Sequence, residues 1–367
     1  MAQTKVGSSL ESDQLAFFDT LSEGFRRASA QVGIVERDYK IAGMNVRLRF
    51  AGSALLPALV PALAHLEMPE SAAPDFTIEL FDAVSTGTPL PFLAARFVDL
   101  LRLRWWEHLE GRREIKQLNG DRIRSVFHLG PDILSVLDTA QNRAIYWVEQ
   151  ADSIPYYETG YPLSVLLNWW LARQGRYFVH AAAIGSAEGG ILLTGRGGSG
   201  KSTTTLACVM AEDLGIMGDD YTAIKPDENR AYSLYNTVKL KRLSDVDRFP
   251  GLRDCVCNLN RVCEAEEGEK AMLFLHEHFP QKLISTMPVR AILVPRIVDG
   301  PDTRIVPVSP AVAFKALAPS TLFQLPGNAQ QAFRAMVEMV RRIPSYEIQL
   351  GNVPGVPGAI RQFLKEN

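Results

Sequence analysis

The sequence has few cysteines, no long hydrophobic run and almost no net charge. Only four cysteines occur among 367 residues, which is too few for a disulfide scaffold in a chain of this length. The most apolar early stretch, residues 54–66, is too short to span a bilayer and is interrupted by Pro57 and Pro61. The formal net charge is −2, so the chain as a whole has no field that would attract nucleic acid or an anionic membrane.

The first residues are polar and lack the charged and then apolar pattern of a secretory signal. Around Trp105 and Trp106, arginines interleave with glutamates, which is typical of a solvated amphipathic helix and not of a nucleic-acid surface. We therefore expect a cytoplasmic protein that has neither a nucleic-acid partner nor a membrane partner. The sequence leaves the oligomeric state open, and a homo-oligomer is compatible with it.

What the chain does contain is the composition of a globular protein, with 47% hydrophobic and 22% charged residues. Its length exceeds the roughly 100–200 residues of one domain, which predicts two domains. We expect a strand-rich α+β domain over residues 1–150 and an α/β domain over residues 151–367. In the first domain the patterns predict a helix in about the first 35 residues, a hairpin within 39–50, a short helix at 55–66, and strands at 76–81, 123–129, 133–138 and 144–148.

Residues 195–202 fit the phosphate-binding pattern G-x-x-x-x-G-K-[ST], known as the P-loop or Walker A motif. An apolar strand is predicted just before them at residues 191–193, and a helix just after them at residues 203–214. Glycines let backbone N–H groups turn inward and form an anion site at a helix N-terminus. In such a site Lys201 neutralises phosphate charge and Ser202 binds Mg²⁺. The predicted ATP-binding residues are Gly195, Arg196, Gly197, Gly198, Ser199, Gly200, Lys201, Ser202 and Thr203.

Two adjacent carboxylates, Asp219 and Asp220, follow the loop after a short return. Gly215 is placed to end the preceding helix as its C′ residue. A surface turn would account for one aspartate better than for two beside such a loop. We therefore favour a functional role for the pair.

A predicted hairpin brings His180 to the same place. Residues 177–184 and 191–194 are strand-like and flank a six-residue turn. If Ile184 pairs with Ile191, an antiparallel register puts His180 opposite Gly195, at the mouth of the loop.

Three segments in this order, residues 179–183, 192–202 and 218–221, resemble the catalytic half of the HPr serine kinase superfamily. That superfamily resembles phosphoenolpyruvate carboxykinase in its P-loop fold and includes kinases of peptide precursors, such as the lasso-peptide kinases. The resemblance covers about residues 175–320. It implies a kinase domain that uses ATP and Mg²⁺.

Carried over by motif, the resemblance implies that the loop amides and Lys201 hold the phosphates and that His180 lies beside the transferred phosphoryl group. One aspartate of the pair would deprotonate the acceptor hydroxyl and the other would serve the metal. Which does which stays open, and Ser202 and Asp220 are taken as the metal candidates. The implied catalytic residues are Asp219, Asp220, His180 and Lys201. The implied partner is a peptide or protein with a serine hydroxyl, and we expect the N-terminal domain to recognise it.

The chain departs from true HPr kinases in two respects. It lacks their Glu-Ile-Arg-Gly-type signature, and residues 235–242 stand there instead, resembling the lysine-containing strand of divergent relatives. Its N-terminal half shows no HPr-kinase regulatory domain. HPr as substrate and the reverse phosphorolysis are therefore both in doubt.

Several other readings stay open. Lys239 and Lys241 either steady phosphate charge or form an exposed basic edge, and Arg290 and Arg296 are candidates for a transition-state arginine. A zinc site at Cys255, Cys257 and Cys263 is disfavoured because it lacks a fourth ligand at suitable spacing. The alternatives to a protein kinase are a catalytically silent ATP-binding sensor or assembly module and a small-molecule kinase.

Overall fold

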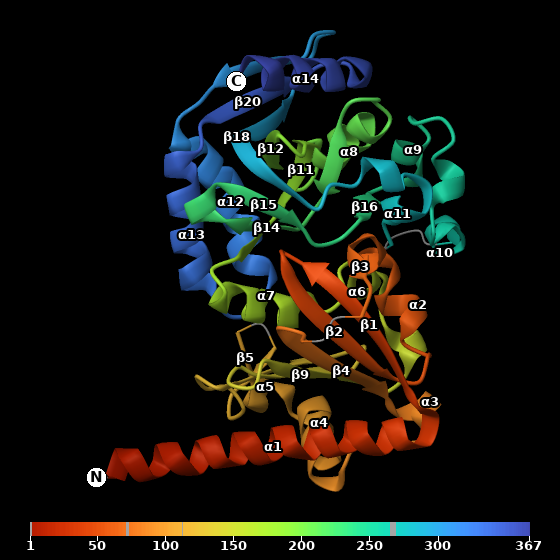
Figure 1. Cartoon of the computed structure of the whole chain (residues 1–367), viewed down its shortest axis with the longest axis vertical. Helices are drawn as coiled ribbons and strands as arrows, with labels where there is room; N and C mark the ends of the chain where they lie inside the picture. The colour runs from red at the N-terminus through yellow and green to blue at the C-terminus, as the bar shows by residue number, and fades with distance from the viewer. Residues whose placement is uncertain (1, 71–72, 112, 265–268) are drawn as a thin grey trace.

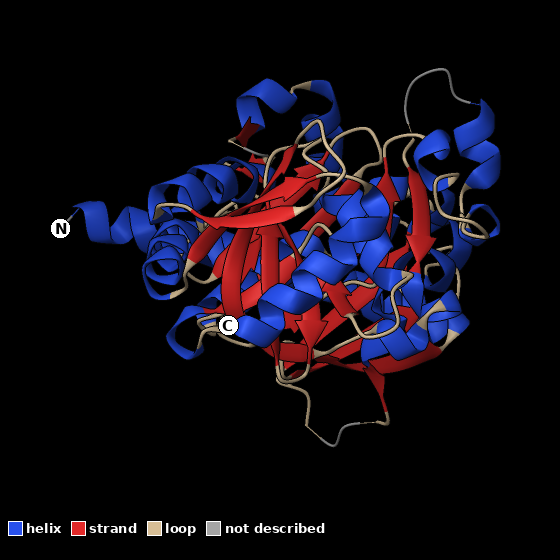
Figure 2. Ribbon diagram, turned by 90° about the horizontal axis from the view of Figure 1, so that it is seen from above, coloured by secondary structure: helices blue, strands red, loops and turns tan. Residues whose placement is uncertain are grey.

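The computed structural model describes residues 2–70, 73–111, 113–264 and 269–367 and contains two large mixed β-sheets. The first sheet lies in the lower half of Figure 1, above the long helix α1, and the second lies in the upper half. Figure 2 shows the strands from above, with helices around them. The expected mixed α/β class is confirmed. In the parts of the chain that the structure describes, no helix combines the length and the apolar character needed to cross a bilayer.

The first sheet is built from residues 34–148. Its β1–β2 hairpin turns at Ala42 and Gly43, whose φ values of 48° and 82° give the twist that tight hairpins need. Strand β4 pairs in parallel with both β2 and β9. In spatial order the strands are β3 (Glu67–Met68), β1 (Ile34–Ile41), β2 (Met44–Ala51), β4 (Phe76–Asp82), β9 (Arg143–Val148), β8 (Ile133–Asp138), β7 (Ile123–His128), β6 (Glu114–Ile115) and β5 (Leu109–Glu110).

Helices pack against both faces of this sheet. Helix α1 (Ala2–Val32) packs against it through Phe18, Leu21 and Phe25. The predicted N-terminal helix is thus confirmed. The shorter helices of this half are α2 (Leu56–Leu59), α3 (Ala83–Thr86), α4 (Phe92–Leu103) and α5 (Trp105–His108), with 3-10 turns at Pro61–Leu66 and Ala151–Ser153.

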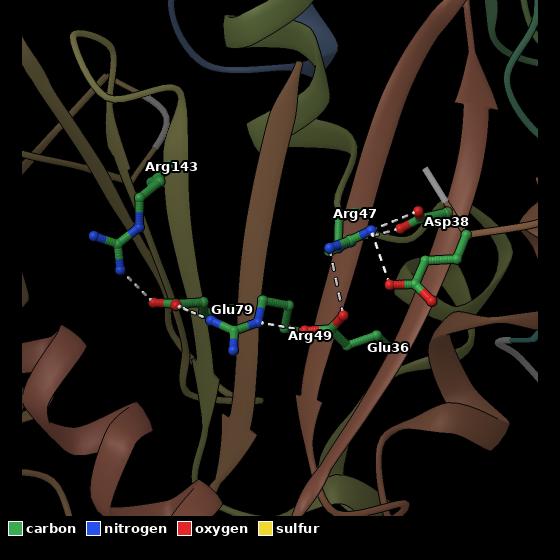
Figure 3. Close-up of polar contacts among 7 residues, drawn as sticks. Glu36, Asp38, Arg47, Arg49, Glu79 and Arg143 are labelled. Atoms are coloured by element: carbon green, nitrogen blue, oxygen red, sulfur yellow. Dashed lines mark hydrogen bonds and ion pairs between the residues drawn. The ribbon is translucent and has the colours of Figure 1, made fainter. Parts of the chain in front are cut away.

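A row of charged side chains crosses β1, β2, β4 and β9 on the face that carries α1 (Figure 3). Arg47 donates to both oxygens of Asp38, at 2.9 Å each. Arg49 bonds to Glu36 at 2.8 Å and to Glu79 at 3.0 Å, and Arg143 bonds to Glu79 at 2.9 Å. We call these residues the charge ladder: Glu36, Asp38, Arg47, Arg49, Glu79 and Arg143.

The second sheet combines parallel and antiparallel pairs, and helices cover both its faces. Helices α8 (Lys201–Val209) and α14 (Val356–Glu366) cover one face, and α12 (Pro310–Gln324) and α13 (Ala329–Arg342) cover the other. Its strands are, in spatial order, β10 (Tyr177–Val179), β14 (Thr222–Lys225), β15 (Arg230–Ser233), β18 (Thr286–Ile297), β12 (Gly189–Thr194), β11 (Ala181–Ser186) and β13 (Gly215–Gly218), with β20 (Ser345–Leu350) beside β18 and β19 (Arg304–Pro307) beside β20.

A separate two-stranded sheet and several short helices complete this half. The sheet pairs β16 (Thr237–Leu240) with β17 (Ala271–Phe274). The helices are α6 (Tyr156–Gly160), α7 (Ser164–Arg173), α9 (Leu243–Val246), α10 (Leu259–Glu264) and α11 (Leu275–His278), and 3-10 turns lie at Pro226–Glu228, Arg253–Cys255, Pro280–Lys282 and Val353–Gly355.

The two halves of the chain share one hydrophobic core. The face of the first sheet opposite α1 packs on helix α7, where the Phe76 ring stacks on Trp170 with centroids 4.7 Å apart. Strands of the second half add Phe178 and Tyr235 to the same core. The domain boundary near residue 150 stays a prediction, and separating the halves there would expose this shared surface to water.

Two predicted helices differ from the observed ones. The helix predicted at 55–66 is divided, because Pro61 cannot donate the backbone hydrogen bond that would continue α2, and a 3-10 turn begins there. The helix predicted at 203–214 begins at Lys201 and ends at Val209. Gly215 is therefore not its C′ residue, and it begins strand β13 instead.

Candidate functional site

The glycine-rich loop, residues 195–200, connects strand β12 to helix α8, as the sequence predicts. Gly198 and Gly200 have φ values of 80° and 100°, in the left-handed region that favours glycine. Lys201 begins α8 and folds back, so that its Nζ donates to the Gly195 carbonyl at 2.6 Å and reaches the Arg196 carbonyl at 3.4 Å. Burial lowers the pKa of this ammonium, while the nearby charges of Asp220 and Asp219 oppose that shift.

The predicted hairpin register is confirmed. Ile184 pairs with Ile191 and Ala181 pairs with Thr194. His180 therefore lies one residue beyond the paired segments of β11 and β12, beside Gly195. The backbone of His180 is held on two sides, since its N–H donates to Thr321 Oγ1 at 3.0 Å and its carbonyl accepts from Thr194 Oγ1 at 3.3 Å. The imidazole therefore projects from a fixed backbone.

The two aspartates follow strand β13, and each has different partners. Asp219 is 1% exposed and accepts a hydrogen bond from Thr205 Oγ1 at 2.8 Å. The Ser202 hydroxyl lies near enough to the Asp219 carboxylate to lower its pKa, whereas Asp219 Oδ2 is buried without a hydrogen-bond partner. Asp220 accepts from the Tyr161 hydroxyl at 2.6 Å and lies 3.4 Å from His180 Nε2.

These surroundings separate the acidities of the two carboxyls. Burial, followed by the charge of Asp220, raises the pKa of Asp219 to about 6. Burial would also raise the pKa of Asp220, but the hydrogen bond and charge of His180, together with the Tyr161 hydroxyl, hold it below its usual value. Asp220 is consequently the more strongly ionised member of the pair.

The loop, His180 and Asp220 line one large cavity of about 1050 Å³. Helix α6 and the following turn contribute Tyr156, Glu158 and Tyr161 to its wall. The first sheet also contributes, through His128 on β7 and Ser135 on β8. The cavity therefore lies where the two halves of the chain meet.

Of the predicted metal candidates, Ser202 and Asp220, the structure brings Ser202 into contact with Asp219 instead. Asp220, in the bend that follows β13, faces Tyr161 and His180. In the described parts of the chain, no three histidine, cysteine or carboxylate side chains gather as a metal-binding group.

Other predicted candidates lie away from the cavity. Arg290 is exposed and donates to the carbonyls of Glu188 and Leu364, and Arg296 pairs with Glu347 at the surface. Neither lines the cavity. Cys255 and Cys257 are free thiols, and the side chain of Cys263 lies outside the described residues.

Sequence reasoning missed Tyr161 as a partner of Asp220, 59 residues away in the chain. The only signal was a tyrosine cluster between Pro155 and Pro162. It also left the role of Lys239 undecided. Both Lys239 and Lys241 line the cavity, but Lys239 is buried, whereas Lys241 lies beyond the end of β16 and is exposed.

No family model matches the chain, and no curated protein matches it in sequence. Among solved structures, the chain is similar to the Hpr(Ser) kinase/phosphatase from Coxiella burnetii, at 12% identity and a TM-score of 0.29. The similarity covers 52% of this chain and 97% of that one. So low a score supports no activity by itself, and the chemistry of the site has to be inferred from its own side chains.

Proposed function

We propose that this protein is an ATP-dependent kinase that transfers the γ-phosphoryl group to a hydroxyl, with a serine of a peptide or protein as acceptor. The observation that carries the proposal is that one cavity contains both the glycine-rich loop with Lys201 and the ionised carboxylate of Asp220. A loop of this kind before a helix binds nucleotide phosphates. A carboxylate beside it can take the proton of an attacking hydroxyl.

The loop suits the phosphates of ATP. The Lys201 ammonium donates to two backbone carbonyls of the loop. Phosphate oxygens of ATP would take the place of these carbonyls and form charge-assisted hydrogen bonds. Ser199 Oγ is buried without a hydrogen-bond partner at the same turn. The N-terminus of α8 adds the favourable end of a helix dipole. Residues 195–203 therefore remain the proposed ATP-binding set.

A magnesium ion fits Asp219 and Ser202 better than the predicted combination of Ser202 and Asp220. The buried Oδ2 of Asp219 has no hydrogen-bond partner, and a hard oxygen of this kind is the ligand that Mg²⁺ prefers. Bound Mg²⁺ would neutralise charge on the β- and γ-phosphates. With Asp219 and Ser202 assigned to the metal, Asp220 is available for proton transfer.

Asp220 then acts as the base. As the acceptor oxygen bonds to the γ-phosphorus, the bond from that phosphorus to the ADP oxygen breaks, and the hydroxyl proton passes to the Asp220 carboxylate. Tyr161 and His180 hold this carboxylate in one orientation, and Lys201 balances the charge that develops on the phosphates. The wall contributed by the first sheet supports a role for the N-terminal half in acceptor recognition.

The test is phosphoryl transfer from labelled ATP to a library of serine-containing peptides, with Mg-ATP affinity measured separately. Asp220→Asn should lower transfer by about 10²–10⁴-fold, the usual contribution of a positioned base, and leave the affinity for Mg-ATP within about twofold. Asp227→Asn, which changes an exposed carboxylate outside the cavity, is the matched control.

Two results would contradict the proposal. Full turnover by Asp220→Asn would remove the base from the mechanism. Tight Mg-ATP binding by the wild-type protein without transfer to any peptide or small hydroxyl compound would favour the silent ATP-binding module.

A further inference from the structure

Lys239 is a buried cation that the mechanism above does not use. It lies on strand β16, is 5% exposed and lines the cavity. Among the described residues, no carboxylate forms an ion pair with it, and no acceptor hydrogen-bonds to it. Burying a charge without an ion pair or a hydrogen bond costs free energy. An anionic group supplied by a ligand would offset that cost.

Two tyrosine rings and a glycine surround the Lys239 ammonium. Its Nζ lies 3.8 Å from the centroid of the Tyr161 ring and 5.4 Å from that of Tyr156, within cation–π range. Beneath it is Gly160, where a Cβ would lie 2.5 Å from Nζ. A Cβ at this position would therefore displace the end of the Lys239 side chain from its present place.

The backbone around this pocket is tied to strand β16. Thr237 Oγ1 donates to the carbonyl of Gly160 at 2.7 Å, and the Tyr235 hydroxyl donates to the carbonyl of Pro162 at 3.0 Å. Tyr161 is further held between the rings of Tyr221 and Tyr235. The ammonium is thus preorganised, which favours ligand binding because little ordering remains to be done.

The position of Lys239 relative to Asp220 indicates what it binds. The Tyr161 hydroxyl donates to Asp220, and Lys239 lies over the ring of the same tyrosine. Lys201 bonds to the carbonyls of the glycine-rich loop, whereas Lys239 stands on strand β16 over the Tyr161 ring. The two lysines therefore serve different places around Asp220, one at the glycine-rich loop and one beyond it.

The cavity as a whole favours anions. Its lining has twice as many cationic side chains as carboxylates. The cations are Arg113, Lys201, Lys239, Lys241, Arg248 and Lys270, and the carboxylates are Glu158, Asp220 and Asp245.

We infer that Lys239 forms a second anion site in the cavity, which takes a carboxylate or phosphate carried by the acceptor a few bonds from its reacting hydroxyl. The identification of the ligand as the phosphoryl acceptor rests on the proposed function. The existence of an anion site at Lys239 does not depend on it. The acceptor class that follows is a hydroxyl compound or residue with a neighbouring anionic group. A neutral alcohol would leave the buried ammonium unpaired and be a poor substrate.

The experiment titrates sulfate by calorimetry into protein already saturated with Mg²⁺ and a non-hydrolysable ATP analogue, so that the loop is filled. The wild type should bind sulfate at one saturable site. Lys239→Met should weaken that binding by about tenfold or more, the usual loss of a hydrogen bond to a charged group. Lys365→Met removes an exposed lysine charge outside the cavity and should change sulfate affinity by less than about twofold.

Acetate and methyl phosphate in place of sulfate then tell a carboxylate from a phosphate as the natural group. Lys239→Met should unfold at or above the wild-type temperature, because it removes an unpaired buried charge. Lys239→Gln is the second neutral variant if the first does not fold. In the transfer assay, sulfate should compete with the acceptor and not with ATP.

Equal sulfate affinity of wild type and Lys239→Met, or no saturable sulfate binding by the nucleotide-loaded wild type, would overturn the inference. A matching loss of affinity for the ATP analogue in Lys239→Met would assign the lysine to the nucleotide and overturn it as well. Failure of the wild type to bind the analogue would instead contradict the proposed function. Sulfate titration into nucleotide-free wild type and Lys239→Met would still decide the anion site, because any sulfate bound by the loop is common to both proteins.

Discussion

The charge ladder and the cavity are both rich in charged side chains, yet their charges are arranged in opposite ways. In the ladder, every carboxylate has an arginine partner within the protein, as the bonds of Figure 3 show. In the lining of the cavity, His180 Nδ1 is buried without a hydrogen-bond partner and Lys239 has no ion pair among the described residues. Next to Asp220, Asp219 Oδ2 is likewise buried without a hydrogen-bond partner.

The difference teaches how to tell a structural charge from a functional one. Buried charges cost free energy unless they are paired. In the charge ladder, arginines of the protein pair with the carboxylates, so these charges do not need a ligand. The cavity leaves several polar groups unsatisfied around one space, as expected where nucleotide, metal and acceptor are to bind.

The largest change in stability should come from breaking the ladder. Arg47→Leu leaves Asp38, whose side chain is 3% exposed, without its bidentate partner. We expect a loss of about 2–4 kcal/mol in the free energy of unfolding, measured with urea. The double variant Asp38→Leu/Arg47→Leu should recover most of that loss, because the buried carboxylate is removed together with its bidentate partner. A single variant as stable as the wild type would contradict the structural role of the ladder.

Removing the cavity lysine should act in the opposite direction. Burial lowers the pKa of Lys239 to about 8, so its charged form is less favourable in the folded state than in the unfolded one. Lys239→Met should therefore raise the free energy of unfolding by about 1–3 kcal/mol at pH 7.

The pH dependence of stability tests whether the charge of Lys239 destabilises the folded state. Between about pH 8 and 10.5 the unfolded chain binds more protons at Lys239 than the folded one, so this contribution to wild-type stability should rise with pH. The difference between wild type and Lys239→Met should therefore shrink across that window. A difference that stays constant would mean that Lys239 is not the titrating group.

A smaller effect is expected from the hydrogen bond between Tyr161 and Asp220. That bond helps to hold the pKa of Asp220 below its usual value, so Tyr161→Phe should raise it and move the acidic limb of kcat/KM to higher pH. Loss of one charge-assisted bond corresponds to roughly a tenfold lower kcat. Tyr157→Phe is the control, because its hydroxyl lies against His128 in the same cavity without contacting Asp220. An unchanged pH profile for Tyr161→Phe would contradict this positioning role.

The smallest effect is expected at an exposed pair. Lys225 and Glu228 bond to each other at the surface. Lys225→Met should leave the urea midpoint of unfolding almost unchanged, since solvent screens such pairs. A marked loss of stability in Lys225→Met would show that solvent exposure does not distinguish this pair from the buried pairs of the charge ladder.

Much of the site was predictable wherever the chemistry is local in the chain. The glycine-rich loop, the strand before it and the helix after it follow from residues 191–209 alone, because glycine freedom and helix-terminus geometry act over a few residues. The register that brings His180 to Gly195 was also predictable, since one turn length sets every pair in a hairpin. The end of α8 was not predictable in this way, because the apolar spacing continues past Val209 into the turn before β13.

The sequence by itself thus determined the loop, the hairpin and the presence of two adjacent carboxylates. Only the tertiary structure decided that Asp219 faces Ser202 while Asp220 faces Tyr161 and His180. It also decided that Lys239 is buried over Gly160 whereas Lys241 is exposed. The physical reason is that hydrogen-bond partners, burial and pKa depend on residues far apart in the chain, which only packing brings together.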